Sequence, residues 1–252
     1  MHAQVRVPSP KRARVGLAVA ACLVGLSVTS EASASGAAGS AQTPQQALQR
    51  SLSAAKGAGP VRITVQFFSG STTGKVVQDS SLRSGEQTVA IGKELASVVF
   101  VGGVAYISGN GQGMTSYFGL PTALGSTLAG RWISVQPADS HFGAITANVG
   151  LASALANVTP SGRLIMGRRS KVNGQAVKSI AGTAPGGGGR LVLFVAARGR
   201  SLPVEAIESS GAGASARGEI VTLSRWGERL HVATPSGAVP LSTIEAAASG
   251  GG

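Results

Sequence analysis

The amino-acid sequence predicts an α+β fold in which a large, curved antiparallel sheet carries helices on one side. One observation is a single amphipathic helix at the start of the folded part, followed by many short segments that alternate between apolar and polar residues. A second is that these segments follow one another too closely for helical crossovers, so neighbouring strands should be antiparallel. The chain has 252 residues, 43% of them hydrophobic, which suffices for a substantial core.

The opening helix is predicted to begin after Thr43. Thr43 can cap the helix, Pro44 suits its first turn, and Gln46 stands where a capping box requires glutamine or glutamate. Gly57 and Gly59 then end the helical pattern. These signals predict one short helix in front of the sheet.

The first strand is predicted where Val61, Ile63, Val65 and Phe67 alternate with polar residues. The other predicted strands lie between turn-forming residues, at 75–78, 87–91, 98–101, 104–107, 163–169, 175–181, 191–197, 202–209, 217–225 and 228–233. Two consecutive glycines separate 98–101 from 104–107 and predict a tight hairpin. A proline at position 203 should stand at a strand start or edge, because proline donates no ladder hydrogen bond.

Two helical patches are predicted between the strands, at 122–129 and 142–155. In the longer one, Ile145, Val149, Ala152 and Leu155 recur at three- and four-residue spacing, which predicts one amphipathic helix. A further helical turn is expected over residues 241–248. The glycine-rich segment 109–113 is expected to be a loop at the sheet rim, and 185–190 a loop between strands.

The first 34 residues have the three parts of a secretion signal. A basic region with Lys11, Arg12 and Arg14 precedes an apolar stretch over residues 15–28, and Ala32 and Ala34 provide small residues for cleavage. Export is therefore expected. Residues 35–42 are predicted to be a flexible tether, and residues 43–248 a single domain.

The single cysteine, Cys22, excludes an intramolecular disulfide and leaves two interpretations open. It is either a small apolar residue of the cleaved signal or the acylated cysteine of a lipoprotein whose signal ends at residue 21. The sequence LAVAAC resembles a lipobox, but the apolar stretch continues beyond the cysteine. A single acyl chain would by itself anchor the protein only marginally.

The net charge of +12 favours an anionic partner such as a membrane surface. The densest basic cluster comprises Arg168, Arg169 and Lys171, which we expect at the solvated edge of a strand. Because no nucleic-acid-binding motif accompanies these residues, nucleic acid is not an expected partner.

The sequence offers no convincing catalytic set. Ser53 and Lys56 have the spacing of a serine–lysine nucleophile, but the partner motifs of that class do not follow. His141 lies near Asp139 without a nucleophile to serve, and Asp139 is expected to cap the following helix. The sequence shows no metal-ligand cluster. We therefore expect a non-enzymatic protein without a cofactor.

Several motifs occur in a characteristic order: VVFVGGVAYISGN, LAGRWISV, KVNGQAVKSIAG, LVLFVAARGRSLPVEAI and IVTLSRWGERLHVATP. This order, over roughly Thr43 to Pro240, resembles the actinobacterial LppX/LprA/LprF/LprG lipoproteins, which share the fold of the LolA and LolB carriers. The resemblance implies a strongly bent antiparallel half-barrel, with helices packed on its concave side and an apolar cavity for acyl chains between them.

By the same resemblance, the protein would be a monomeric carrier of a lipid or lipoglycan in the cell envelope, working with a membrane surface and an envelope transport partner. It would be either anchored through Cys22 or secreted after cleavage near Ala34. An alternative is a non-catalytic envelope module with a filled core, which binds a protein or an anionic wall polymer. Alternation along strands and helices gives the cavity-lining candidates Ile63, Val65, Phe67, Val99, Val101, Ile145, Val149, Leu193 and Val195.

Overall fold

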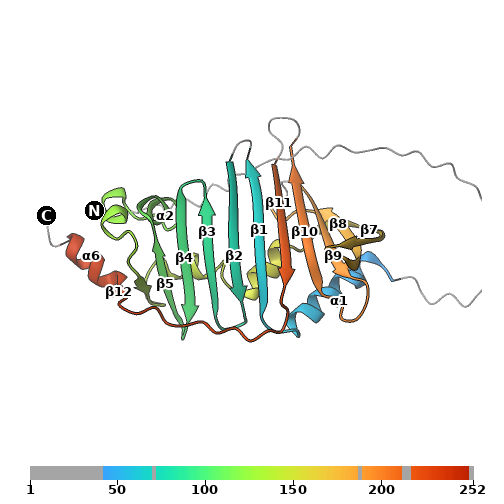
Figure 1. The fold of residues 1–252 in the computed structure, drawn as a ribbon, viewed down its shortest axis with the longest axis horizontal. Helices are drawn as coiled ribbons and strands as arrows, with labels where there is room; N and C mark the ends of the chain where they lie inside the picture. Colours follow the sequence, from blue (N-terminus) through green and yellow to red (C-terminus); the bar gives the residue numbers. More distant parts are fainter. Residues whose placement is uncertain (1–41, 70–71, 187–188, 212–216, 250–252) are drawn as a thin grey trace, which may run out of the picture.

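The computed structural model describes residues 42–69, 72–186, 189–211 and 217–249. These residues form six helices and one sheet of twelve strands in the order β12-β6-β5-β4-β3-β2-β1-β11-β10-β9-β8-β7. All neighbouring strands are antiparallel except β12 and β6, which are parallel. Figure 1 shows the strands as one continuous row that ends at β7. The α+β antiparallel architecture predicted from the sequence is therefore confirmed.

The strands hold more of the described residues than the helices do. They are β1 (Val61–Ser69), β2 (Thr72–Ser80), β3 (Gly85–Ile91), β4 (Glu94–Val101), β5 (Val104–Gly109), β6 (Ile133–Val135), β7 (Ser161–Val172), β8 (Gln175–Thr183), β9 (Arg190–Ala196), β10 (Pro203–Ser210), β11 (Arg217–Ser224) and β12 (Val239–Pro240). The helices are α1 (Pro44–Lys56), α2 (Gly111–Ser116), α3 (Thr122–Thr127), α4 (Phe142–Thr146), α5 (Leu151–Asn157) and α6 (Leu241–Ser249).

The strand register identifies the face of the sheet that the helices cover. Ile63 of β1 lies opposite Gln78 of β2, which lies opposite Gln87 of β3, which in turn lies opposite Val98 of β4. On its other side, Ile63 lies opposite Leu223 of β11. Directly opposed residues of neighbouring strands point to the same face. We call this face, which carries the two larger clusters of buried apolar side chains, the inner face, and the opposite one the outer face.

Two apolar clusters lie between the inner face and the helices. The first apolar cluster joins α1 and α5 to β1 and β8–β11, through Leu48, Ala55, Val61, Ile63, Leu151, Ala154, Leu155, Val158, Ile180, Ala184, Leu191, Leu193, Val195, Ala206, Val221 and Leu223. The second apolar cluster joins α2 and α6 to β3–β6, through Val89, Ala96, Val98, Ala105, Ile107, Met114, Phe118, Leu120, Leu128, Ile133, Val135, Val149, Leu241 and Ile244. Partly buried side chains of α3 and α4 pack against the second cluster.

The local signals at the first helix and the first hairpin are confirmed. The Thr43 amide donates to Gln46 Oε1 over 3.1 Å and the Gln46 amide donates to Thr43 Oγ1 over 3.2 Å, which completes the capping box of α1. Gly102 and Gly103 have φ of 61° and 79°, the left-handed backbone that a tight two-residue hairpin requires. Pro203 is the first residue of β10, as proline chemistry predicts.

The prediction of a single helix over residues 142–155 is wrong, because the structure has two helices there. α4 ends at Thr146, and Gly150 has the extended conformation of an N-cap (φ −87°, ψ 152°) before α5 begins. The carbonyl oxygen of Val149 accepts a hydrogen bond from Ser80 of β2 instead of continuing a helix. A tertiary contact therefore divides a segment whose periodicity suggested one helix.

Three other local predictions are also wrong. Part of the segment 109–113, which was expected to be a rim loop, belongs to α2 (Gly111–Ser116). The Asn110 side chain caps this helix by accepting from the Gly113 amide over 2.8 Å. Residues 228–233 form no strand. Asp139 does not cap α4; its carboxylate instead accepts from the Gln136 amide over 2.6 Å within the preceding turn.

Candidate functional site

A chain of four polar side chains crosses the inner face where β2 and β3 lie side by side. Tyr117 donates its hydroxyl proton to Gln87 Oε1 over 2.7 Å, and Gln87 Nε2 donates to Gln78 Oε1 over 3.1 Å. Gln78 Nε2 donates to Ser80 Oγ over 2.6 Å, and Ser80 Oγ donates to the carbonyl oxygen of Val149 over 2.8 Å. We call these four side chains the polar chain. It includes three of the five buried polar residues in the described chain, the other two being Ser51 and Ser134.

The polar side chains of this chain are buried, so each of them needs a hydrogen-bond partner. Ser80, Gln78 and Gln87 are 0%, 5% and 7% exposed, and a buried polar group without a partner would cost roughly 1–3 kcal/mol. Burial also raises the pKa of Tyr117 above its ordinary value, so the phenol keeps the proton that it donates to Gln87. The polar chain was not predicted from the sequence, although Gln78 and Gln87 share the inward phase of Val76 and Val89.

The end of the polar chain fastens the segment between α4 and α5 to the sheet. Besides the Ser80–Val149 hydrogen bond, the Leu151 amide donates to the Ser81 carbonyl oxygen over 3.4 Å. Gly85 of β3 makes this approach possible, because a Cβ at this position would lie 2.7 Å from the Val149 carbonyl oxygen and 2.9 Å from Val149 Cγ1. The segment that joins α4 to α5 therefore packs directly against the backbone of β3 at Gly85.

Seven of the nine predicted lining residues either belong to or pack against the two apolar clusters, or point to the inner face of the sheet. They are Ile63, Leu193 and Val195 in the first apolar cluster, Val65 packed against it, Val149 in the second cluster, Ile145 packed against that one, and Phe67 in the inward phase of β1. The Phe67 ring covers Gly74 of β2, where a Cβ would meet it at 1.9 Å. Contact of these residues with a ligand remains a prediction.

Val99 and Val101 do not belong to this set. Val98 faces inward opposite Gln87, so Val99 and Val101 point to the outer face, where Val99 lies opposite Glu86 and Tyr106. β4 is apolar at every position from Val98 to Val101, and such a run does not indicate which residues point inward. Cys22 and the predicted signal peptide lie outside the described residues.

Two hollows lie on the described part of the chain outside the layer between the sheet and the helices. A groove of about 400 Å³ opens beside β3, β4 and β5, and is lined by Thr88, Leu95, Ala96, Ser97, Ser108, Gly109, Asn110, Ala129, Gly130 and Trp132. Thr88 and Ser97 lie directly opposite each other on the outer face, and Ser97 lies opposite Ser108.

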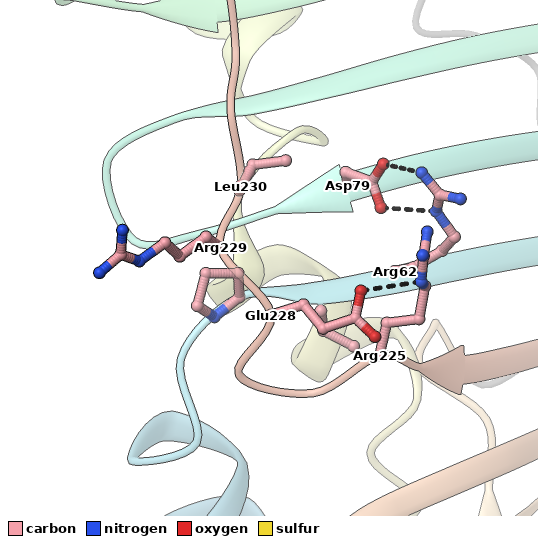
Figure 2. A pocket seen from close by; sticks show the side chains of 8 residues that line it. Arg62, Asp79, Arg225, Glu228, Arg229 and Leu230 are labelled. Carbon is pink, nitrogen blue, oxygen red and sulfur yellow. Dashed lines mark hydrogen bonds and ion pairs between the residues drawn. The ribbon is translucent and has the colours of Figure 1, made fainter.

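The second hollow, of about 70 Å³, lies where the segment after β11 passes β1 and β2 (Figure 2). The Arg62 guanidinium donates two hydrogen bonds to the Asp79 carboxylate, from Nε to Oδ1 over 2.8 Å and from Nη2 to Oδ2. Hydrogen bonding to Asp79 raises the pKa of Arg62. Arg225 pairs with Glu228 over 2.9 Å. Four of the five charged residues that line the hollow form these two ion pairs, and Arg229 belongs to neither of them. Because most of the charge is paired, we interpret this hollow as a structural junction.

The described residues include no group of three or more His, Cys, Asp or Glu side chains placed to hold a metal ion. His141 contacts Ser140, with Nδ1 3.1 Å from Oγ. In the part of the chain that the structure covers, no helix combines the length and the apolar character needed to cross a membrane.

The curved antiparallel sheet with helices on its inner face defines a LolA-like fold, as the sequence predicted. LprF from Mycobacterium bovis is similar over 77% of this chain and 97% of its own, with a TM-score of 0.50 and 17% sequence identity. The chain therefore has the LppX/LprF-type lipoprotein fold. An uncharacterized conserved protein from Thermus thermophilus has a TM-score of 0.41 at 10% identity, over 78% of this chain and 97% of that one.

The Pseudomonas aeruginosa protein MucB, in its complex with MucA, has a TM-score of 0.37 and 16% identity, over 76% of this chain and 59% of that one. No family model matches the sequence. No curated protein matches it either.

Proposed function

We propose that this protein is a non-enzymatic carrier that holds the acyl chains of a lipid or lipoglycan between the inner face of its sheet and the covering helices. The observation that supports it most is the way the two layers meet. Within the described residues, they contact each other mainly through the aliphatic side chains of two apolar clusters. The LprF-type fold adds support at the level of architecture.

An interface of this kind can exchange helix side chains for acyl chains. Hydrophobic burial is not directional, and each buried methylene contributes about 0.8 kcal/mol wherever it lies in the apolar layer. The described hydrogen bonds between helical segments and the strands lie at two places. One is the polar chain with its neighbour Ser81. The other is the rim of the sheet, where Asn110 caps α2 and the Gly130 amide donates to the Gly109 carbonyl oxygen over 2.7 Å. Between these attachment points, separating the layers would break few directional contacts.

The proposed carrier is exported and works in the cell envelope. The basic and apolar leader supports export. Cys22 provides the position for an acyl anchor, and cleavage near Ala34 would give a secreted form in its place. The basic balance of the chain would favour contact with anionic membranes.

A second candidate function is a filled-core envelope module that binds a partner through its surface. It is favoured by the tight packing of the interior, where Leu193 and Ile180 are 0% and 1% exposed. The two functions differ in one physical respect: the carrier must open its apolar layer, and the module must not.

A matched pair of substitutions tests the carrier. Val65→Trp adds bulk on the inner face beside the first apolar cluster, whereas Val101→Trp adds the same bulk on the outer face. In fluorescence titrations with a pyrene-labelled phospholipid, Val65→Trp should lower uptake at least fivefold and Val101→Trp should change it less than twofold. Equal uptake by both variants, or a loss confined to Val101→Trp, would place any bound lipid outside the interior and contradict the proposal.

A further inference from the structure

The hairpin of β7 and β8 forms one end of the sheet (Figure 1). Its sequence is strongly basic. Between Ser161 and Thr183 the chain has no acidic residue and five basic ones: Arg163, Arg168, Arg169, Lys171 and Lys178. β7 is the last strand in the sheet order, so within the described residues its far edge pairs with no strand. An open edge offers unpaired backbone donors and acceptors.

The register identifies which backbone groups point outward. The Ala197 amide donates to the Ala176 carbonyl oxygen over 2.9 Å, so the backbone of Ala176 is turned toward β9. In an antiparallel strand the N–H and C=O of one residue point to the same side. Lys171 lies opposite Ala176 and therefore turns its own N–H and C=O away from β8. Arg169, two residues earlier and opposite Lys178, has the same orientation.

The side chains along this edge are cations of one face. Arg169 lies directly opposite Lys178, and Lys171 follows two residues further along β7 on the same face. Like charges in direct cross-strand opposition destabilise a sheet. The ion pairs recorded in the described residues join Arg62 to Asp79 and Arg225 to Glu228, away from this hairpin. The edge therefore combines unused backbone groups with positive charge that lacks a neutralising neighbour in the described chain.

Breaks in the β7–β8 register limit the part of the β7 edge that could pair with another strand. Register shifts fall between Ser161 and Ile165 and between Met166 and Arg169 on β7, and regular pairing runs from Arg169 to Val172. The exposed cations would repel a second copy of the same edge, so self-pairing is disfavoured while an oppositely charged strand is attracted. The charge of this edge therefore excludes a second copy of the same strand but not an acidic one.

We propose that the Arg169–Val172 edge of β7 binds an extended acidic segment of a partner protein as an additional strand. The N–H and C=O groups of Arg169 and Lys171 form the main-chain hydrogen bonds, and acidic side chains at every second partner residue reach Arg169, Lys171 and Lys178. Lys178 lies opposite Val195 of the first apolar cluster, so the cations lie at the margin of the inner face. The proposal rests on the backbone groups and the charge of the edge and does not depend on lipid carriage.

The probe is an acetylated and amidated peptide of alternating Glu and Thr, with a Gln–Thr peptide as its uncharged match. Isothermal titration of the full-length protein at low salt should detect the Glu–Thr peptide and bind the Gln–Thr peptide at least tenfold more weakly. The triple variant R169Q/K171Q/K178Q should weaken binding at least tenfold. The control R83Q/K93Q/R131Q removes three exposed cations elsewhere and should change binding less than twofold.

Two measurements test strand addition itself. Lys171→Pro removes an outward N–H without removing a bond to β8. It should weaken binding at least tenfold relative to Lys171→Gln, which removes the same charge and keeps the N–H, while circular dichroism stays unchanged. In the unmodified protein, the peptide should slow amide hydrogen exchange at Arg169 and Lys171. Absence of peptide binding, unchanged exchange at these two amides, or equal binding of polyphosphate or phosphatidylglycerol vesicles with the same dependence on the hairpin cations would overturn the proposal.

Discussion

The Ser80 hydroxyl donates a hydrogen bond to the carbonyl oxygen of Val149 over 2.8 Å, between two residues that are 69 positions apart. This contact fixes the junction of α4 and α5 against the sheet, and it ends the polar chain that begins at Tyr117. It therefore links the two layers that the proposed carrier would separate to admit acyl chains.

Replacing Ser80 by Ala should loosen this junction. The variant leaves the Val149 carbonyl and one Gln78 N–H without their partner, which should lower the free energy of unfolding by about 1–3 kcal/mol in urea titrations. It should also speed lipid exchange in stopped-flow measurements. Ser116→Ala, at an exposed position of α2, is the control and should stay within about 0.5 kcal/mol. An unchanged stability of Ser80→Ala would mean that the contact contributes nothing.

Gly85→Ala should displace the same junction by steric pressure. The added Cβ would lie 2.7 Å from the Val149 carbonyl oxygen, too close for either group to remain in place, and should cost about 1–3 kcal/mol. Gly143→Ala in α4 meets no atom within 4 Å and should leave stability unchanged or slightly improved. Thermal unfolding of both variants checks the prediction, which fails if their melting temperatures shift equally.

Leu193→Ala should be costly because Leu193 is fully buried in the first apolar cluster. The lost contacts and the cavity left behind should lower stability by about 2–5 kcal/mol. Leu82→Ala, at a side chain that is 74% exposed, should cost no more than about 0.5 kcal/mol. Chemical denaturation of the two variants provides the comparison, and similar losses would argue against a packed first cluster.

Glu205→Gln should stabilise the protein at neutral pH and not in acid. Burial raises the pKa of Glu205, so the fold favours its protonated form. That preference contributes stability below the unfolded pKa of about 4.3 and is lost as the pH rises through the higher folded value. The melting temperature of Glu205→Gln should therefore exceed that of the unmodified protein at pH 7, with the gap closing near pH ~3.5. A gap that is constant with pH would exclude titration of Glu205 as its cause.

Local signals predicted the beginning of the fold well. The Thr43 and Gln46 pair lies within a few residues and needs no tertiary partner, so the sequence was enough to place α1. The same holds for the turn at Gly102 and Gly103, where positive φ at both positions suits glycine. The strand order also followed from short connections, because successive strands from β1 to β5 are direct neighbours.

Features that depend on distant contacts were not predictable in this way. The break between α4 and α5 depends on Ser80 and Gly85, which lie more than sixty residues earlier. The inward phase of β4 could not be read from a run that is apolar on both faces, so Val99 and Val101 were placed wrongly. β12 depends on β6, its parallel neighbour about a hundred residues earlier, and the two strands, of two and three residues, are too short to show a periodic pattern.

Native mass spectrometry of the protein purified from an expressing actinobacterial host, followed by organic extraction, tests the central claim most directly. A carrier should retain a stoichiometric extra mass that extracts as a lipid or lipoglycan. The fraction of protein that carries this mass should fall in Val65→Trp but not in Val101→Trp. A bare polypeptide mass that takes up neither added phospholipid nor added glycolipid would contradict the carrier and favour the filled-core module.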